Sequence, residues 1–197
     1  EAVRAALGLP AADFVILMVG IIRGVKRHAV ALRALQRLLP DLPHARLVLA
    51  GDGPIRPGIE RLAAELNLAG RVQFLGFRND VADLMGASDL LLLTSQSEGV
   101  PQAVTQALGL GLPVVATRVG GVPELILHER TGLLIPPEDP EAAAVAILRC
   151  AREPEAARRL GRAGREHALA HFSLKAMLDK VERLCLHLLS EKKRAPV

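Results

Sequence analysis

The chain has 197 residues, 50% of them hydrophobic and 23% charged, and its formal net charge is +4 when the histidines are neutral. This composition excludes an intrinsically disordered or collagen-like chain. The apolar runs fall far short of the roughly 18 to 20 residues that a bilayer span needs, and no basic-then-apolar leader opens the sequence. We therefore expect a soluble chain of one domain, or of one domain with a small appendage.

Aromatic residues are scarce, since the sequence has no Trp, no Tyr and only four Phe. The stacking platforms of single-stranded nucleic-acid binders are therefore missing, and a nucleic-acid partner is not expected. Arginines at helical spacing between Arg158 and Arg165 are predicted to form a solvated helix face. Cys150 and Cys185 lack the spacing of zinc ligands and are predicted to be buried free thiols.

Short runs rich in Val, Ile and Leu alternate with longer segments of helical periodicity. This alternation predicts an α/β fold, namely a Rossmann-like doubly wound parallel sheet of about six strands with a C-terminal helical tail. The strands are predicted at about 14–19, 46–50, 71–75, 89–94, 113–117 and 132–135. The helices are predicted at about 26–39, 55–67, 80–86, 101–110, 121–127, 140–152, 155–170 and 173–189.

Turn and cap residues agree with these boundaries. Pro101 is predicted in the first turn of a helix, and Asp139 is predicted to be an N-cap followed by Pro140 at the first helical position. Glu191 to Val197 is predicted to be a fraying terminus. Glu1 to Leu9 reads as a helix entered mid-course, so we expect a piece of a longer chain.

In a doubly wound sheet, ligands bind at the carboxyl ends of the strands. Arg23 and Lys26 follow the first strand, and two cations beside a helix start suit a diphosphate, although solvated loop cations are an open alternative. Glu98 lies outside a predicted helix start, where it could contact a ligand or act as a capping carboxylate. Glu124 has the same ambiguity, while the preceding glycines allow a close backbone approach or a positive φ.

Other chemistries find little support in the sequence. The six histidines are dispersed and none has a Cys or carboxylate at ligand spacing, so surface or packing roles are expected and no metal site is predicted. The dinucleotide-binding Gly-x-Gly-x-x-Gly, the P-loop and the Gly-x-Ser-x-Gly elbow are all absent.

A series of six motifs carries a more specific signal, and they lie at 47–54, 72–77, 95–101, 111–117, 119–124 and 131–137. In this order the motifs resemble the donor-binding half of GT-B fold enzymes, most closely the retaining glycosyltransferase family four (group 1 type). The likeness runs from about Val15 to Ala170. It implies a truncated linker or helix at 1–13, a nucleotide-sugar-binding domain at 14–171, and a C-terminal helix and tail at 172–197. In the family such a helix packs toward the N-terminal domain, so its apolar face would be exposed here.

The resemblance also assigns roles to residues. It implies Glu98, Lys26 and Arg23 as catalytic residues, with Glu98 contacting the transferred sugar and the cations serving the diphosphate. The substrate-binding residues that it implies are Gly20, Phe77, Arg78, Gly99, Val100, Gln102, Gln106, Gly120, Gly121 and Glu124.

The chain departs from the family pattern at two of these positions. Gln106 stands where the family has a second glutamate that contacts the ribose, so donor affinity or nucleotide preference is in doubt. Ile21 follows Gly20 where the family has an arginine, although Lys26 is in register and Arg23 is a candidate substitute.

The resemblance implies transfer of a hexose from a nucleoside diphosphate sugar with retention at the anomeric carbon and without a cofactor or an obligatory metal. The acceptor would be a glycan or a lipid-linked molecule bound by a missing N-terminal domain, in polysaccharide, lipopolysaccharide or glycolipid assembly. A cytoplasmic location is expected, and peripheral association with the inner face of the membrane stays open. The alternatives are a degenerate nucleotide- or partner-binding domain without turnover and a GT-B epimerase, and the fragment alone is expected to be inactive.

Overall fold

The computed structural model describes residues 2–194, with side chains up to residue 189. Its helices are α1 (Ala2–Ala6), α2 (His28–Leu38), α3 (Arg56–Glu65), α4 (Val81–Gly86), α5 (Gln102–Leu110), α6 (Val122–Leu125), α7 (Pro140–Arg152), α8 (Pro154–His171) and α9 (Leu174–Arg194). Its strands are β1 (Phe14–Val19), β2 (Ala45–Ala50), β3 (Val72–Gly76), β4 (Leu90–Leu93), β5 (Val114–Thr117) and β6 (Leu133–Ile135).

The six strands form one parallel sheet in the order β3-β2-β1-β4-β5-β6. The chain moves outward from β1 to β3, returns to pair β4 with β1, and then moves outward in the other direction. The strand order therefore reverses between β1 and β4, and this switch point is where a doubly wound sheet leaves a crevice at its carboxyl edge. The predicted fold class is confirmed.

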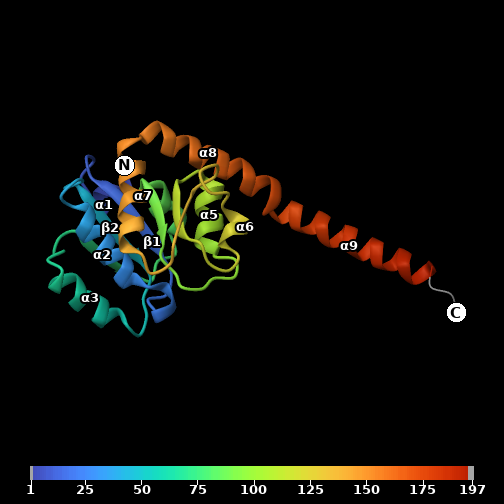
Figure 1. The fold of residues 1–197 in the computed structure, drawn as a ribbon, viewed down its shortest axis with the longest axis horizontal. Coiled ribbons are helices and arrows are strands. Elements are labelled where there is room, and N and C mark those ends of the chain that lie inside the picture. The colour runs from blue at the N-terminus through green and yellow to red at the C-terminus, as the bar shows by residue number, and fades with distance from the viewer. Residues whose placement is uncertain (1, 195–197) are drawn as a thin grey trace.

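Helices cover both faces of the sheet (Figure 1). Alternate strand residues point to opposite faces. Ile16 and Leu47 pack with α2, α3 and α7 on one side, whereas Leu17 and Val48 pack with α4, α5 and α6 on the other. Because both faces are buried, β1, β2, β4, β5 and β6 consist almost entirely of buried apolar residues.

Most predicted elements agree with the structure to within one or two residues. Asp139 is confirmed as an N-cap, since its side chain accepts a hydrogen bond from the Ala142 N–H at 2.9 Å. Pro101 is the N-cap residue of α5 and does not lie in its first turn. The helix predicted from residue 26 begins at His28, because Gly24–Lys26 forms a 3-10 turn that Arg27 closes with a φ of 50°.

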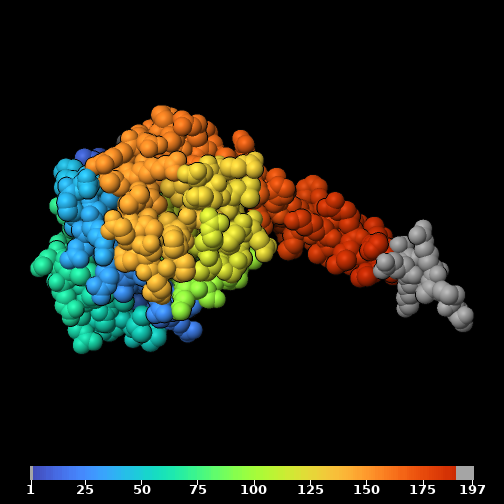
Figure 2. All heavy atoms as spheres, in the orientation of Figure 1, coloured from blue at the N-terminus to red at the C-terminus, as the bar shows by residue number. Residues whose placement is uncertain are grey.

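The C-terminal part differs more from the expectation. Helix α9 runs to Arg194, past the predicted end at 189 and into the stretch predicted to fray; residues 195–197 lie outside the described chain. Cys185 is exposed on this helix, so the prediction that both cysteines are buried was wrong for Cys185 and right for Cys150. The helix projects away from the body of the molecule (Figures 1 and 2). None of the helices in residues 2–194 is long and apolar enough to cross a membrane.

Candidate donor site

Two loops at the switch point form the centre of the candidate site. The first follows β1 and runs through Gly20 to Arg27, and the second follows β4 and runs from Thr94 to Pro101. They are tied together by a backbone hydrogen bond from the Gln96 N–H to the Val25 carbonyl at 2.8 Å. The buried Thr94 hydroxyl adds contacts to the carbonyls of Lys26 and Arg27 at 3.0 and 3.1 Å.

Lys26 and Glu98 meet across these loops although 72 positions separate them in the sequence. The Lys26 ammonium donates to Glu98 Oε1 at 2.6 Å, and the side chains are 24% and 11% exposed respectively. The Ser95 hydroxyl donates to the same oxygen at 2.6 Å. Among the described residues no partner contacts Oε2, so one carboxylate oxygen is held while the other is available to a ligand.

Glycines in the loop after β5 allow its backbone to contact the backbone of the Glu98 loop directly. A Cβ on Gly120, whose φ is +49°, would lie 1.8 Å from the Glu98 carbonyl oxygen, and the Gly121 N–H donates to that oxygen at 3.1 Å. The expected close approach and positive φ are therefore present. The backbone that these glycines approach is the Glu98 loop, so their geometry has a structural cause whether or not they bind a ligand.

Gly20 lies in a similar backbone contact on the other side of the crevice. A Cβ on Gly51 would lie 1.9 Å from the Gly20 carbonyl oxygen. The Ile22 N–H donates to the Asp52 carbonyl at 2.9 Å. The loop after β2 thus fixes the course of the loop that carries Lys26.

Arg23 and Ile21 lie on the Lys26 loop, and both are exposed. Arg23 makes no ion pair with any residue of the described chain, in contrast to Lys26. The structure therefore brings Lys26 and Glu98 together and leaves Arg23 outside their contacts. A role for Arg23 at a diphosphate stays a prediction.

The predicted base-binding edge lies on the loop after β3. Phe77 is 79% exposed. Arg78 is held by Asp80 through hydrogen bonds of 2.8 and 2.5 Å, which lower the pKa of the Asp80 carboxyl and raise that of the Arg78 guanidinium. Gln106 on α5 faces this loop across a cavity of about 410 Å³ that Asn79 and Ala82 also line.

The backbone after Glu98 leads directly into α5. Neither Gly99 nor Val100 donates a backbone hydrogen bond within residues 2–194, and no side chain caps α5. Val100 and Gln102 line a cavity of about 330 Å³ together with Phe172 at the end of α8 and Met177 in the first turn of α9. Glu124, also predicted to bind substrate, is exposed in the first turn of α6 and makes no ion pair in the described chain.

Sequence reasoning missed several residues of this region. Ser95 and Thr117 are fully buried hydroxyl residues, and the Thr117 hydroxyl donates to the Ser95 carbonyl at 2.6 Å. Arg27 joins three loops by contacting Gln96 and Glu138. Small polar residues at strand ends are common, so their types alone do not reveal which of them will be buried in such a network.

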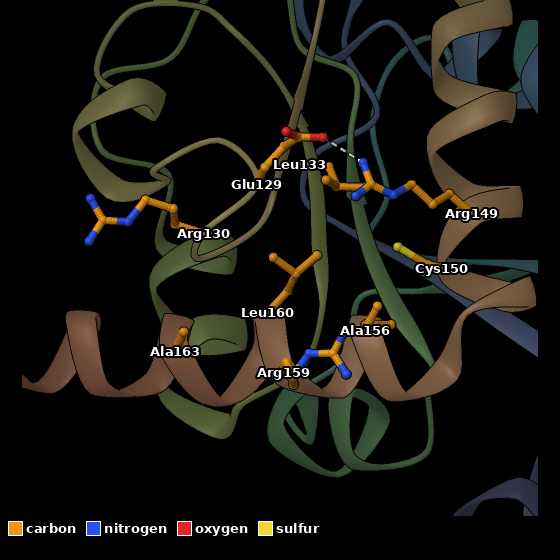
Figure 3. A pocket seen from close by; sticks show the side chains of 10 residues that line it. Glu129, Arg130, Leu133, Arg149, Cys150, Ala156, Arg159, Leu160 and Ala163 are labelled. Carbon is orange, nitrogen blue, oxygen red and sulfur yellow. Dashed lines mark hydrogen bonds and ion pairs between the residues drawn. The ribbon is translucent and has the colours of Figure 1, made fainter.

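A separate cavity of about 260 Å³ lies at the opposite, amino end of the strands (Figure 3). Glu129 and Arg130 come from the loop before β6, and Cys150 comes from the end of α7. The Arg149 guanidinium donates to Glu129 at 2.6 Å and lowers the pKa of that carboxyl. Burial raises the pKa of the Cys150 thiol to about 11, so this thiol is a poor nucleophile at neutral pH.

No group of three or more His, Cys, Asp or Glu side chains within residues 2–194 is arranged to hold a metal ion. The available binding groups at the switch point are instead a cation, a carboxylate oxygen and free backbone N–H groups. Such a set can bind an anion and a neighbouring hydroxyl group.

Comparisons with known proteins agree with this arrangement. Residues 1–167 match the family model described as glycosyl transferases group 1. The N-acetyl-alpha-D-glucosaminyl L-malate synthase of Bacillus anthracis is 30% identical over 190 residues, which cover 96% of this chain and 50% of that protein. The D-inositol 3-phosphate glycosyltransferase of Saccharomonospora viridis is 37% identical over 189 residues, which cover 90% of this chain and 44% of that protein.

Solved structures show the same likeness. The Anabaena protein Alr3699/HepE in complex with UDP-glucose superposes with a TM-score of 0.87 at 26% identity, covering 94% of this chain and 52% of that one. The chain thus spans about half the length of the proteins it resembles.

Proposed function

This chain belongs to the group 1 glycosyl transferases, and from that premise we propose that it is the donor-binding half of a retaining glycosyltransferase that uses a nucleoside diphosphate sugar. The observation that carries the proposal is the Lys26–Glu98 pair at the switch point of the sheet. The complexes of the similar Anabaena protein with UDP and UDP-glucose support a uridine nucleotide as the first donor to test.

The diphosphate would lie between Lys26 and the start of α5. A lysine ammonium has three N–H donors, so Lys26 can keep its contact with Glu98 and still donate to phosphate oxygens. The free N–H groups of Gly99 and Val100 and the positive end of the α5 dipole add to this attraction. These groups would stabilise the charge that develops on the departing nucleoside diphosphate, with no metal ion required.

Glu98 would accept a hydroxyl group of the transferred sugar through Oε2. Its first oxygen is already engaged by Lys26 and Ser95, so the carboxylate is suited to orient the ring and is poorly suited to act as a covalent nucleophile. Retention would then follow a same-face route in which the acceptor enters on the side from which the nucleotide leaves, and this route relies on positioning.

Further parts of the proposal concern the complete enzyme. We place acceptor binding in a part of the enzyme outside this chain, because the chain spans about half the length of its relatives. The proposal also includes a hexose as the transferred sugar, a glycan or lipid-linked acceptor, and a role in polysaccharide or glycolipid assembly. It places the enzyme in the cytoplasm, with or without contact to the inner membrane face. The isolated chain would bind donor without transferring sugar.

A calorimetric titration of the chain with UDP, GDP, ADP and UDP-glucose tests the proposal. We expect saturable binding of one nucleotide, and we expect Lys26→Ala to weaken it at least tenfold, because the variant loses a charge-assisted phosphate contact. Lys175→Ala, which removes an exposed lysine on α9, is the matched control and should bind as the wild type does. The absence of nucleotide binding in both the chain and the complete enzyme would refute the proposal.

A further inference from the structure

Glu98 is fixed by more than its ion pair with Lys26. The Ser95 hydroxyl, fully buried, donates to Glu98 Oε1 at 2.6 Å, the same oxygen and the same distance as the lysine contact. Because both donors converge on one oxygen, they determine how the carboxylate plane is turned. The second oxygen then has a defined position even though it has no partner in the described chain.

Ser95 is in turn held from the neighbouring strand. Thr117, the last residue of β5, is fully buried and donates its hydroxyl to the Ser95 carbonyl at 2.6 Å. The loop that follows Thr117 binds the Glu98 backbone, since the Gly121 N–H donates to the Glu98 carbonyl at 3.1 Å. The loop after β5 thus fixes both the residue that orients the carboxylate and the backbone that carries it.

The two donors to Glu98 differ in how they would respond to a ligand. Lysine is a compact charge on a flexible stem, and a bound diphosphate would attract the Lys26 ammonium away from Glu98. The Ser95 side chain is short and fully buried, so its hydroxyl group cannot follow the ligand in this way. The serine contact is therefore the one that can persist when the diphosphate engages the lysine.

From these contacts we propose that Ser95 and Thr117 are positioning residues, which hold Glu98 so that its second oxygen accepts a hydroxyl group of the donor sugar. The inference rests on the proposed function and extends it to residues that touch no substrate. Thr117 fixes the backbone of Ser95, and Ser95 fixes the carboxylate. Their effect should therefore be confined to the sugar and should not extend to the nucleotide.

The test compares UDP binding with the release of UDP from UDP-glucose in the complete enzyme. For Ser95→Ala we expect kcat/KM for UDP-glucose to fall about 10- to 100-fold, the range for losing a hydrogen bond to a charged group, while the Kd for UDP stays within about twofold. Thr117→Val should cause a smaller loss of kcat/KM that is equally selective. Thr117→Ser, which keeps the hydroxyl group, should keep the wild-type kcat/KM. A residue that only stabilised the fold would affect both readouts together.

Two controls make the result decisive. Ser88→Ala removes a hydroxyl that binds the Leu84 carbonyl at 2.7 Å outside the site, and it should change neither readout. In a Glu98→Gln background, Ser95→Ala should have little further effect, because the serine acts through the carboxylate. Additive losses in that double variant, or equal losses of UDP affinity and turnover in Ser95→Ala, would overturn the inference. A wild-type enzyme that bound no nucleotide would instead refute the proposed function.

Discussion

Gln106 gives the candidate nucleoside site a neutral amide where a carboxylate would make a stronger hydrogen bond. The side chain is exposed on α5 and borders the cavity beside Asn79. We expect Gln106→Glu to tighten UDP binding roughly 3- to 10-fold, because a charged acceptor forms a stronger bond with a ribose hydroxyl. Calorimetry with UDP measures the change.

Two comparisons isolate the ribose contact. The gain should vanish with 2′,3′-dideoxy-UDP, which lacks the hydroxyl groups. Gln36→Glu introduces the same charge on α2, away from the site, and should leave the affinity for UDP unchanged. Weaker binding by Gln106→Glu would show that position 106 faces the phosphates and not the ribose.

His28 lies at the start of α2 and is only 4% exposed. Its Nδ1 has no hydrogen-bond partner within residues 2–194, and burial together with the charge of Lys26 lowers its pKa from 6.5 to about 4. The unfolded chain therefore takes up this proton at higher pH than the folded chain, so protonation favours unfolding. The contribution to stability is complete above pH 6.5 and decreases by up to about 3 kcal/mol as the pH falls toward 4.

Replacing His28 tests this pH dependence. His28→Phe keeps a planar ring and removes the proton site, so its free energy of unfolding should fall less steeply between pH 6.5 and 4 than that of the wild type. Urea unfolding followed by far-UV circular dichroism provides the measurement, since the chain lacks Trp and Tyr. His44→Gln, at an exposed loop position, should keep the wild-type slope. An identical slope in His28→Phe would contradict the assignment.

At the scale of elements, two glycines let α8 pack closely against the turn between α5 and β5 and against the loop before β6. A Cβ on Gly161 would lie 2.1 Å from the Gly111 carbonyl oxygen, and one on Gly164 would lie 2.9 Å from the Thr131 carbonyl oxygen. The arginines of this segment, Arg158, Arg159, Arg162 and Arg165, are all exposed. Their predicted solvated face is confirmed, and the glycines between them supply the buried face.

Gly161→Ala should therefore destabilise the protein although alanine is the better helix former. Overpacking against the backbone is expected to cost about 1–3 kcal/mol of unfolding free energy. Gly58→Ala is the matched control, because a Cβ at Gly58 in α3 meets nothing within 4 Å. The free energy of unfolding of this control, measured in urea, should rise by about 0.5–1 kcal/mol. A similar rise for Gly161→Ala would show that α8 is not tightly packed at Gly161.

The elements of the sheet were predictable because their signal is local. Buried parallel strands such as β1 and β4 are continuous apolar runs, and the Asp139 cap has a sequence signature. The turn at Lys26 was not predicted, because the αL conformation of Arg27 is stabilised by contacts with Gln96 and Glu138 from distant loops. The Thr117–Ser95 contact likewise depends on how β4 and β5 are placed side by side.

At the scale of the whole molecule, α9 presents an apolar face that the rest of the described chain does not cover. Leu174, Met177, Val181, Leu184 and Leu188 recur at spacings of three and four residues and are between 51% and 69% exposed. This spacing places them along one side of the helix. Figure 2 shows the helix standing clear of the body of the molecule. An exposed apolar face of this kind favours association, because covering it removes apolar surface from water.

We therefore expect the chain to self-associate as its concentration rises, and we expect the double variant Val181→Lys, Leu184→Lys to remain monomeric in sedimentation velocity. Leu186→Lys is the control, since Leu186 lies about 160° round the helix from Leu184 and should leave association unchanged. Neither change should alter the unfolding of the sheet domain, because these side chains are exposed. Unchanged association of the double variant would move the contact to another surface, whereas a monomeric wild type would show that α9 needs a different partner, such as the remaining part of a longer enzyme.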